Sequence, residues 1–162
     1  MEIRFAESLH SSDRFSKIYG NWGASYEVEA STQLPYCIDG WCNFDWFSKH
    51  GRSEGLDNPT RVQIATVSLG VRFPYQFCER FTGYLGIGPT ISRIWIKNNS
   101  ECSRGKTSKL LIGGVLKSGV IYSLCGNIFC DFFADYIYQP VHFETQVDIG
   151  GLKLGAGVGI EF

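Results

Sequence analysis

The closing segment of the chain constrains its fold most strongly. Residues 152–162 read Leu-Lys-Leu-Gly-Ala-Gly-Val-Gly-Ile-Glu-Phe, so apolar side chains alternate there with glycine or a charge. Because successive side chains of a strand point to opposite faces, one face of this strand is wholly apolar. The other face carries only Lys153, Glu161 and glycine. Such a strand fits between lipid and a narrow polar lumen, as in a transmembrane β-barrel.

The same alternation recurs in seven earlier segments, and no segment predicts a long helix. In the second of them, Tyr26 and Val28 alternate with Glu27 and Glu29. Most segments reach the length of about 9–11 residues that a tilted transmembrane strand needs. The predicted strands are residues 2–11, 23–34, 41–49, 61–75, 80–97, 109–124, 128–139 and 147–162.

The connections between these strands alternate between short and long. Short turns on one rim and longer polar loops on the other are typical of outer-membrane barrels, and an even strand number places both termini on the short-turn rim. Closure removes the unpaired edges that lipid cannot satisfy. The chain therefore predicts one all-β domain over residues 1–162, an eight-stranded antiparallel up-and-down transmembrane β-barrel. The short connections are 34–41, 75–80 and 124–128; the long ones are 12–22, 49–61, 97–109 and 139–147.

Composition excludes some alternatives. The length of 162 residues suits a single domain, and a net charge of −1 argues against a nucleic-acid partner. No apolar run is long enough for a transmembrane helix, and alternation hides a lipid-facing surface from mean hydropathy. Met1 leads directly into Glu-Ile-Arg-Phe. We therefore expect the mature form of an exported protein, with the signal peptide absent and an initiator Met added.

The polar parity of the strands brings charged side chains into the lumen. An eight-stranded barrel is just wide enough for side chains to fill it, and buried charges are costly unless paired. We expect a salt-bridged plug; a path for protons or ions is the alternative. No cofactor or metal is predicted. The predicted lumen network contains Arg4, Glu27, Glu29, Asp45, Arg72, Lys117, Asp131, Asp135 and Lys153.

Aromatic residues near the strand ends predict girdles at the two membrane interfaces, although strands are enriched in aromatics generally. Glu7 and Arg93 break the apolar parity, so each is expected at a bulge or near a rim, where a charge costs little. The long-loop girdle would contain Trp22, Trp95 and Tyr138, and the short-turn girdle Tyr36, Trp41, Phe73, Tyr75, Phe81 and Phe162.

With these features the chain resembles the small eight-stranded bacterial outer-membrane barrels, the class of OmpX and the membrane domain of OmpA. In that family the last strand ends in an assembly signal, which Gly157, Ile160 and Phe162 match, whereas Gly155 occupies its polar position. Residues 84–88, Tyr-Leu-Gly-Ile-Gly, also resemble the aromatic–glycine strands of this class. The resemblance implies a location in the bacterial outer membrane, contact with its lipid, and recognition by the outer-membrane insertion machinery.

Five of the six cysteines fall near the short-turn rim. The candidate disulfides are Cys37–Cys42 and Cys125–Cys130, each bracketing one turn, since a bridge needs Cα atoms about 4.4–6.8 Å apart. Bonds between neighbouring proteins are a second possibility. Free thiols acting as small apolar side chains are the third.

Three functions remain open. The first is a structural, adhesion or surface-recognition role, with an unidentified ligand bound by the long loops. The second is a lipid A acyltransferase or deacylase, which needs a nucleophile and base such as Ser11 or Ser12 with His10, but no acid partner is evident. The third is a soluble lipocalin-like barrel, with the apolar parity inside. His10, His50 and His142 also fall near the long-loop end, where solvated loop positions explain them better than a metal site.

Overall fold

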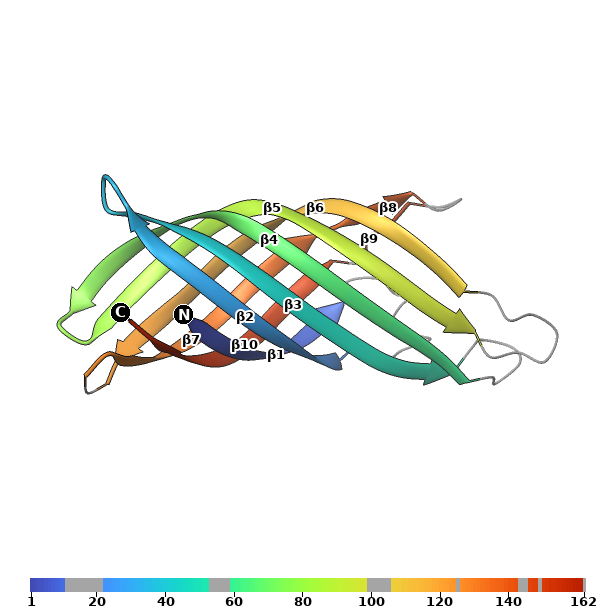
Figure 1. Ribbon diagram of the computed structural model, residues 1–162, viewed down its shortest axis with the longest axis horizontal. Helices are drawn as coiled ribbons and strands as arrows, with labels where there is room; N and C mark the ends of the chain where they lie inside the picture. Colours follow the sequence, from blue (N-terminus) through green and yellow to red (C-terminus); the bar gives the residue numbers. More distant parts are fainter. Residues whose placement is uncertain are drawn as a thin grey trace.

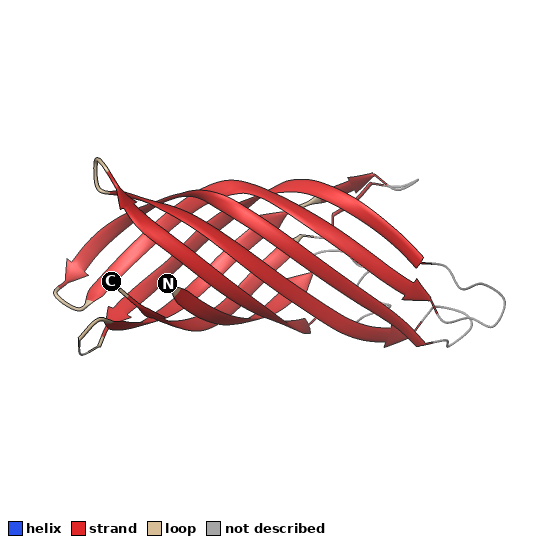
Figure 2. Ribbon diagram, viewed as in Figure 1, coloured by secondary structure: helices blue, strands red, loops and turns tan. Residues whose placement is uncertain are grey.

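The computed structural model shows eight strands closed into one antiparallel barrel (Figures 1 and 2), as the sequence predicts. Each strand pairs with its neighbours along the chain, and the first pairs with the last. The barrel strands are β1 (Glu2–His10), β2 (Trp22–Leu34), β3 (Ile38–Arg52), β4 (Pro59–Cys78), β5 (Phe81–Asn98), β6 (Lys106–Ser123), β7 (Ile128–Tyr138) and β10 (Gly151–Ile160). The structure describes residues 1–10, 22–52, 59–98, 106–124, 126–142, 146–148 and 150–161.

The connections sort by rim, and both termini lie at the end that carries the short turns (Figure 1). Between residues 139 and 150, two short strands, β8 (Pro140–His142) and β9 (Gln146–Asp148), pair as a separate hairpin. The last barrel strand therefore begins at Gly151, whereas the sequence predicted a start near 147. Within the described ranges, no helix is long and apolar enough to cross a membrane.

The first short turn is tighter than predicted. Leu34 pairs with Ile38, so only three residues connect β2 to β3. Tyr36 and Cys37 turn the chain with φ values of 70° and 57°, in the left-handed region that closes tight hairpins. The third strand consequently starts at Ile38, three residues before the predicted start at 41.

Apolar side chains cover the outer wall of the barrel. Ile3 is 68% exposed and Ile112 is 69% exposed. The side chains on the same parity of β1 and β6 also point outward. This orientation excludes the inside-out arrangement of a lipocalin-like barrel. Aromatic pairs lie on the same wall near the rims, such as Tyr75 with Phe77, whose ring centroids are 5.0 Å apart. Trp41, which was predicted in the short-turn girdle, is instead buried in the lumen because it shares the inward parity of β3.

The two charged side chains that break the apolar parity in the sequence, those of Glu7 and Arg93, do lie on this wall. Glu7 is exposed and pairs in regular register with Leu154 and Ala24, so β1 has no bulge there. It lies three residues before the long-loop end of β1, or about 10 Å of strand. Arg93 is also exposed, and its guanidinium carbon lies 5.4 Å from the ring centroid of Trp95. Both charges lie toward the long-loop rim, where a lipid-facing charge is least costly.

Candidate functional site

The lumen is filled by charged side chains from β1, β2, β3, β4, β6, β7 and β10. The structure places all nine predicted lumen residues inside the barrel, and none of them is more than 7% exposed. Sequence reasoning missed Glu2, which is 3% exposed, and Tyr84, which is 4% exposed. Their inward parity could have revealed both, since Glu2 shares the face of Arg4 and Tyr84 alternates with outward-facing Leu85.

Arg4 is the centre of the larger group, which we call the Arg4 cluster: Glu2, Arg4, Glu29, Arg72, Tyr84, Lys117, Asp131 and Asp135. The Arg4 guanidinium donates from Nε to Glu2 Oε1 at 2.9 Å, and its Nη2 forms an ion pair with Asp131. Its Nη1 lies 3.2 Å from Glu29 Oε2 and 3.6 Å from Asp135 Oδ2. One guanidinium therefore serves four carboxylates from three strands.

Aromatic rings complete the surroundings of Arg4. Its Nη2 donates to the Tyr84 hydroxyl at 2.7 Å, and that hydroxyl donates to Asp131 Oδ2 at 2.8 Å. The Arg4 guanidinium carbon also lies 4.4 Å from the ring centroid of Phe133, within range of a cation–π contact. Gly157 makes room for this arrangement, because a Cβ there would overlap Glu2 Oε1 and contact Arg4 Cγ at 2.8 Å.

Two further cations extend the Arg4 cluster toward the short-turn rim and across the lumen. Lys117 forms an ion pair with Glu29, and its Nζ is 3.6 Å from Asp135 Oδ2 and 4.5 Å from the ring centroid of Trp41. Arg72 bridges Asp39 at 3.0 Å and Glu29 at 3.4 Å. Glu29 thus connects all three cations.

A smaller group, the Lys153 cluster, consists of Glu27, Asn43, Asp45 and Lys153. Lys153 Nζ lies 2.7 Å from both Glu27 Oε1 and Asp45 Oδ2. Asn43 Nδ2 donates to the second oxygen of Glu27 at 2.9 Å. Beside this cluster, neutral side chains form hydrogen bonds with one another: Thr66 with Ser92, and Gln139 with Ser92 and Thr90.

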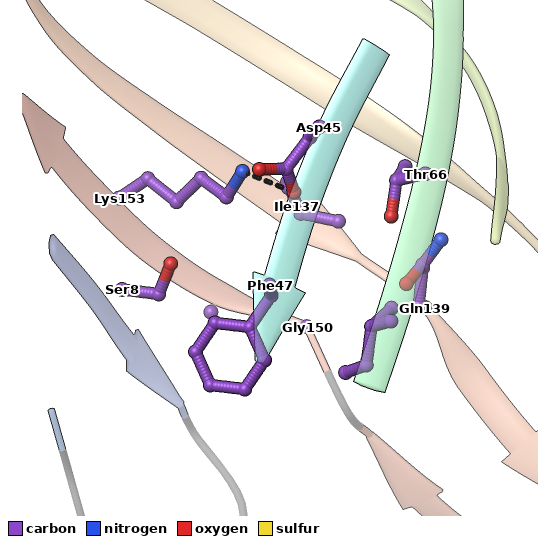
Figure 3. A pocket seen from close by; sticks show the side chains of 10 residues that line it. Ser8, Asp45, Phe47, Thr66, Ile137, Gln139, Gly150 and Lys153 are labelled. Atoms are coloured by element: carbon purple, nitrogen blue, oxygen red, sulfur yellow. Dashed lines mark ion pairs between the residues drawn. The ribbon is translucent and has the colours of Figure 1, made fainter. Parts of the chain in front are cut away.

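Little space remains between these side chains. One lumen cavity of about 30 Å³ lies beside Lys153 and Asp45 (Figure 3), and another of about 10 Å³ lies between Lys117, Asp135 and Glu27. A cavity of this size holds one or two water molecules. The arrangement can therefore fix the barrel and hold small polar species in these two cavities.

The outer wall carries a much larger depression, of about 1000 Å³. Its lining is mainly outward-facing and apolar, with Phe73, Leu85, Phe132 and Leu154 around Ala134 and Ser118. None of its lining residues is charged. Lipid acyl chains can fill such a surface without any specific recognition.

The predicted assembly signal is only partly described. Gly157 faces the lumen and Ile160 faces outward on β10, opposite Ile128 of β7. Phe162 lies outside the described residues. Recognition of this segment by insertion machinery stays a prediction.

The candidate disulfide between Cys37 and Cys42 is not formed, and both thiols are free, which was the third possibility. The reason is that β3 begins at Ile38: the extended strand from there to Cys42 separates the two Cα atoms by about 3.3 Å per residue, well beyond bridging range. Cys130 is also free and pairs in register with Tyr122, and Cys125 lies outside the described residues. Cys37 and Cys78 are both exposed at the short-turn end.

The other predicted candidates lie largely outside what the structure describes. Ser11 and Ser12 are not in the described ranges, and nothing is shown of the side chains of His10, His50 and His142. Within the described part of the chain, no group of three or more His, Cys, Asp or Glu side chains is arranged to hold a metal ion.

Comparison with known proteins identifies the fold. No family model matches the chain, and no curated protein does. Among solved structures, Neisserial surface protein A superposes with a TM-score of 0.78 at 16% identity, over 99% of this chain and 95% of that one. Ail of Yersinia pestis, solved with the heparin analogue sucrose octasulfate, gives 0.62 at 15% identity over 97% and 94%. The N-terminal barrel of Pseudomonas aeruginosa OprF gives 0.53 at 15% over 96% and 95%. The chain therefore has the fold of the small eight-stranded outer-membrane β-barrels.

Proposed function

We propose that this protein is a non-enzymatic outer-membrane barrel that presents its four long connections at the cell surface for adhesion or recognition. The observation that carries this proposal is the filled lumen, whose nine predicted charged residues are all buried and ion-paired. A barrel without a solute-sized passage does not work by conduction. Its contacts with other molecules then depend on its rims and on its lipid-facing wall.

Several observations support the outer membrane as the location. The outer wall is apolar along the strands, and closure leaves no unpaired edge in lipid. The similar outer-membrane barrels match over nearly their whole length. The lipid A acyltransferase or deacylase alternative would depend on Ser11 or Ser12 with His10, and Ser11 and Ser12 lie outside the described residues.

The proposed plug of the lumen has a direct electrical consequence. We expect the purified barrel, inserted into a planar lipid bilayer, to give no stepwise conductance at neutral pH. The two cavities described among the lumen ion pairs measure about 30 and 10 Å³, which is too small for a hydrated solute. Single-channel recording checks this, with a large porin as the positive control. Reproducible conductance steps from the folded barrel would contradict the plug.

The third long connection is the best candidate for ligand contact. Lys97, Arg104, Lys106 and Lys109 make residues 97–109 basic, which favours a polyanionic surface ligand such as a phosphate-bearing or sulfated glycan. Ail, which shares the fold, was solved with a sulfated heparin analogue.

Charge reversal tests this ligand class. We expect the combined variant Arg104→Glu with Lys106→Glu to bind immobilised heparin at least about 10-fold more weakly than wild type, because at least two charge-assisted contacts are lost. Surface plasmon resonance at two salt concentrations measures this. The matched control reverses Arg80 to Glu in a short turn on the opposite rim. Equal binding by all three proteins would reject the third connection as the site.

The free thiols give a test of orientation. In single-cysteine variants, we expect a membrane-impermeant maleimide to label Cys37 or Cys78 only after the outer membrane is permeabilised, because both lie at the short-turn rim. Cys102, in the third long connection, is the natural control and should be labelled in intact cells. Labelling of Cys37 in intact cells would reverse the proposed orientation.

A further inference from the structure

The long-loop ends of β3, β4, β5 and β6 carry an excess of positive charge. In these four neighbouring strands, residues 46–52, 59–67, 91–98 and 106–112 contain seven Lys or Arg and no Asp or Glu. With the two connections that join these ends, residues 46–67 and 91–112 still hold eight bases and three acids. On the other side of the barrel, the outer wall of β1 carries Glu7 instead.

Part of this excess lies on the outer wall rather than in the lumen. Arg61 is exposed and precedes the buried Val62, and Arg93 is exposed between two buried neighbours on β5. Arg61 pairs in register with Lys97, and Lys97 pairs with Lys106, so three bases occupy one row across β4, β5 and β6. We call Arg61, Arg93, Lys97 and Lys106 the basic patch.

Strand length places the basic patch beyond the hydrocarbon. β4 has 20 residues and β5 has 18, whereas about 9–11 residues cross the bilayer core. Figure 1 shows that β4, β5 and β6 run further toward the long connections than β1 and β10 do. At the short-turn rim, the ring centroids of Phe81 and Tyr122 are 4.8 Å apart. About 10 residues along β5 from Phe81 lead to Ile91, so Arg93 is the next outward position, at the level of the lipid head groups.

Two tryptophans mark the same level independently of charge. Trp46 and Trp95 are half-buried on the outer wall, and their ring centroids are 6.1 Å apart. Indole rings favour the boundary between hydrocarbon and head groups. The guanidinium carbon of Arg93 lies 5.4 Å from the ring centroid of Trp95. An arginine held against an indole still presents N–H donors at its edge, which suit a phosphate.

We propose that the basic patch binds the phosphate head groups of anionic lipids in the leaflet on the long-connection side. The charges match a phosphate, and the adjoining indoles and apolar wall match acyl chains, so the ligand combines an anionic head with an apolar tail. Arg93 lies four residues along β5 from Lys97, or about 13 Å of strand, so the patch can contact more than one phosphate. This inference rests on the proposed membrane location and is independent of the proposed adhesive role.

Trp46 and Trp95 are built-in reporters for a lipid beside the basic patch. The barrel is inserted into vesicles of equal amounts of phosphatidylcholine and phosphatidylglycerol. Bromine atoms, which quench indole fluorescence, are placed on the acyl chains of only one of the two lipids, so the composition stays constant. The background variant Trp22→Phe removes one other indole, and Trp41 is buried in the lumen, away from lipid.

The test variant combines Arg61→Gln with Arg93→Gln, and both positions are exposed, so the barrel should still fold. We expect brominated phosphatidylglycerol to quench the background protein at least about twice as strongly as brominated phosphatidylcholine, because basic side chains concentrate anionic lipid. The Gln pair should at least halve this excess, since Lys97 and Lys106 remain. Replacing both arginines by lysine should keep most of it. Arg80→Gln, at the short-turn rim, should leave it unchanged.

Three results would overturn the proposal. Equal quenching by the two brominated lipids in the background protein would show that the wall does not select anionic lipid. An excess that is unchanged in the Gln pair would assign the selection to bases outside the basic patch. Quenching by neither lipid would contradict the membrane location itself, which distinguishes failure of the proposed location from failure of the lipid site.

Discussion

Replacing Arg4 by methionine is expected to lower the free energy of unfolding by at least about 3–5 kcal/mol, because it leaves buried carboxylates without their cation. Arg4 serves Glu2, Glu29, Asp131 and Asp135, and its own side chain is fully buried. Urea titration of the folded barrel, read by gel mobility without boiling, measures the change. Folding yield from the denatured state gives a second readout.

Two variants control the Arg4 experiment. Arg4→Lys keeps the charge but loses the planar fork of donors, so its stability should lie between wild type and Arg4→Met. Arg93→Met removes an exposed arginine that contacts Trp95 on the outer wall, and it should cost no more than about 1 kcal/mol. An Arg4→Met barrel as stable as the Arg93→Met barrel would show that the lumen network does not hold the fold together.

The second large effect on stability is expected from a substitution on the outer side of the barrel wall, opposite the lumen. Leu116→Arg should destabilise the inserted barrel by about 2–4 kcal/mol, because Leu116 is 54% exposed near the middle of β6, where an arginine would meet hydrocarbon. Unfolding from lipid vesicles measures this cost. In a soluble barrel, the same substitution on an exposed position should be nearly neutral.

A position on the same parity but near the rim provides the control for that substitution. Leu124 follows the end of β6 at the short-turn rim and shares the parity of Leu116. Leu124→Arg should cost only about 0–1 kcal/mol, since a charge near the interface reaches water. Equal costs at both positions would argue against a hydrocarbon slab around the barrel.

The sequence predicts the barrel well because alternation and turn spacing are local signals. Tyr26 and Glu27 already separate the lipid face from the lumen, and every lumen residue chosen on parity is buried. Trp41 was predicted as a girdle residue because it lies near a rim, and that prediction is wrong. Its parity is that of Asp45, which places its side chain in the lumen. Glu2 was missed although Arg4 has the same parity.

Contacts across the lumen could not be predicted from the sequence. Arg4 meets Asp131 and Lys153 meets Glu27 over separations of 127 and 126 residues. Such pairings depend on the stagger of the strands around the closed barrel, which no local pattern encodes. The absence of the candidate Cys37–Cys42 disulfide could not be predicted for a related reason, because the start of β3 depends on its pairing with β2.

The central claim is that this chain forms a closed barrel inserted in the outer membrane, and heat-dependent gel mobility tests it most directly. The protein is expressed with an export signal, recovered from the outer-membrane fraction, and run on SDS gels with and without boiling. We expect extraction to require detergent and the unboiled sample to migrate differently from the boiled one, because the closed hydrogen-bonded barrel resists SDS until it is heated. A monomer that is soluble without detergent and shows no heat-dependent shift would contradict the account.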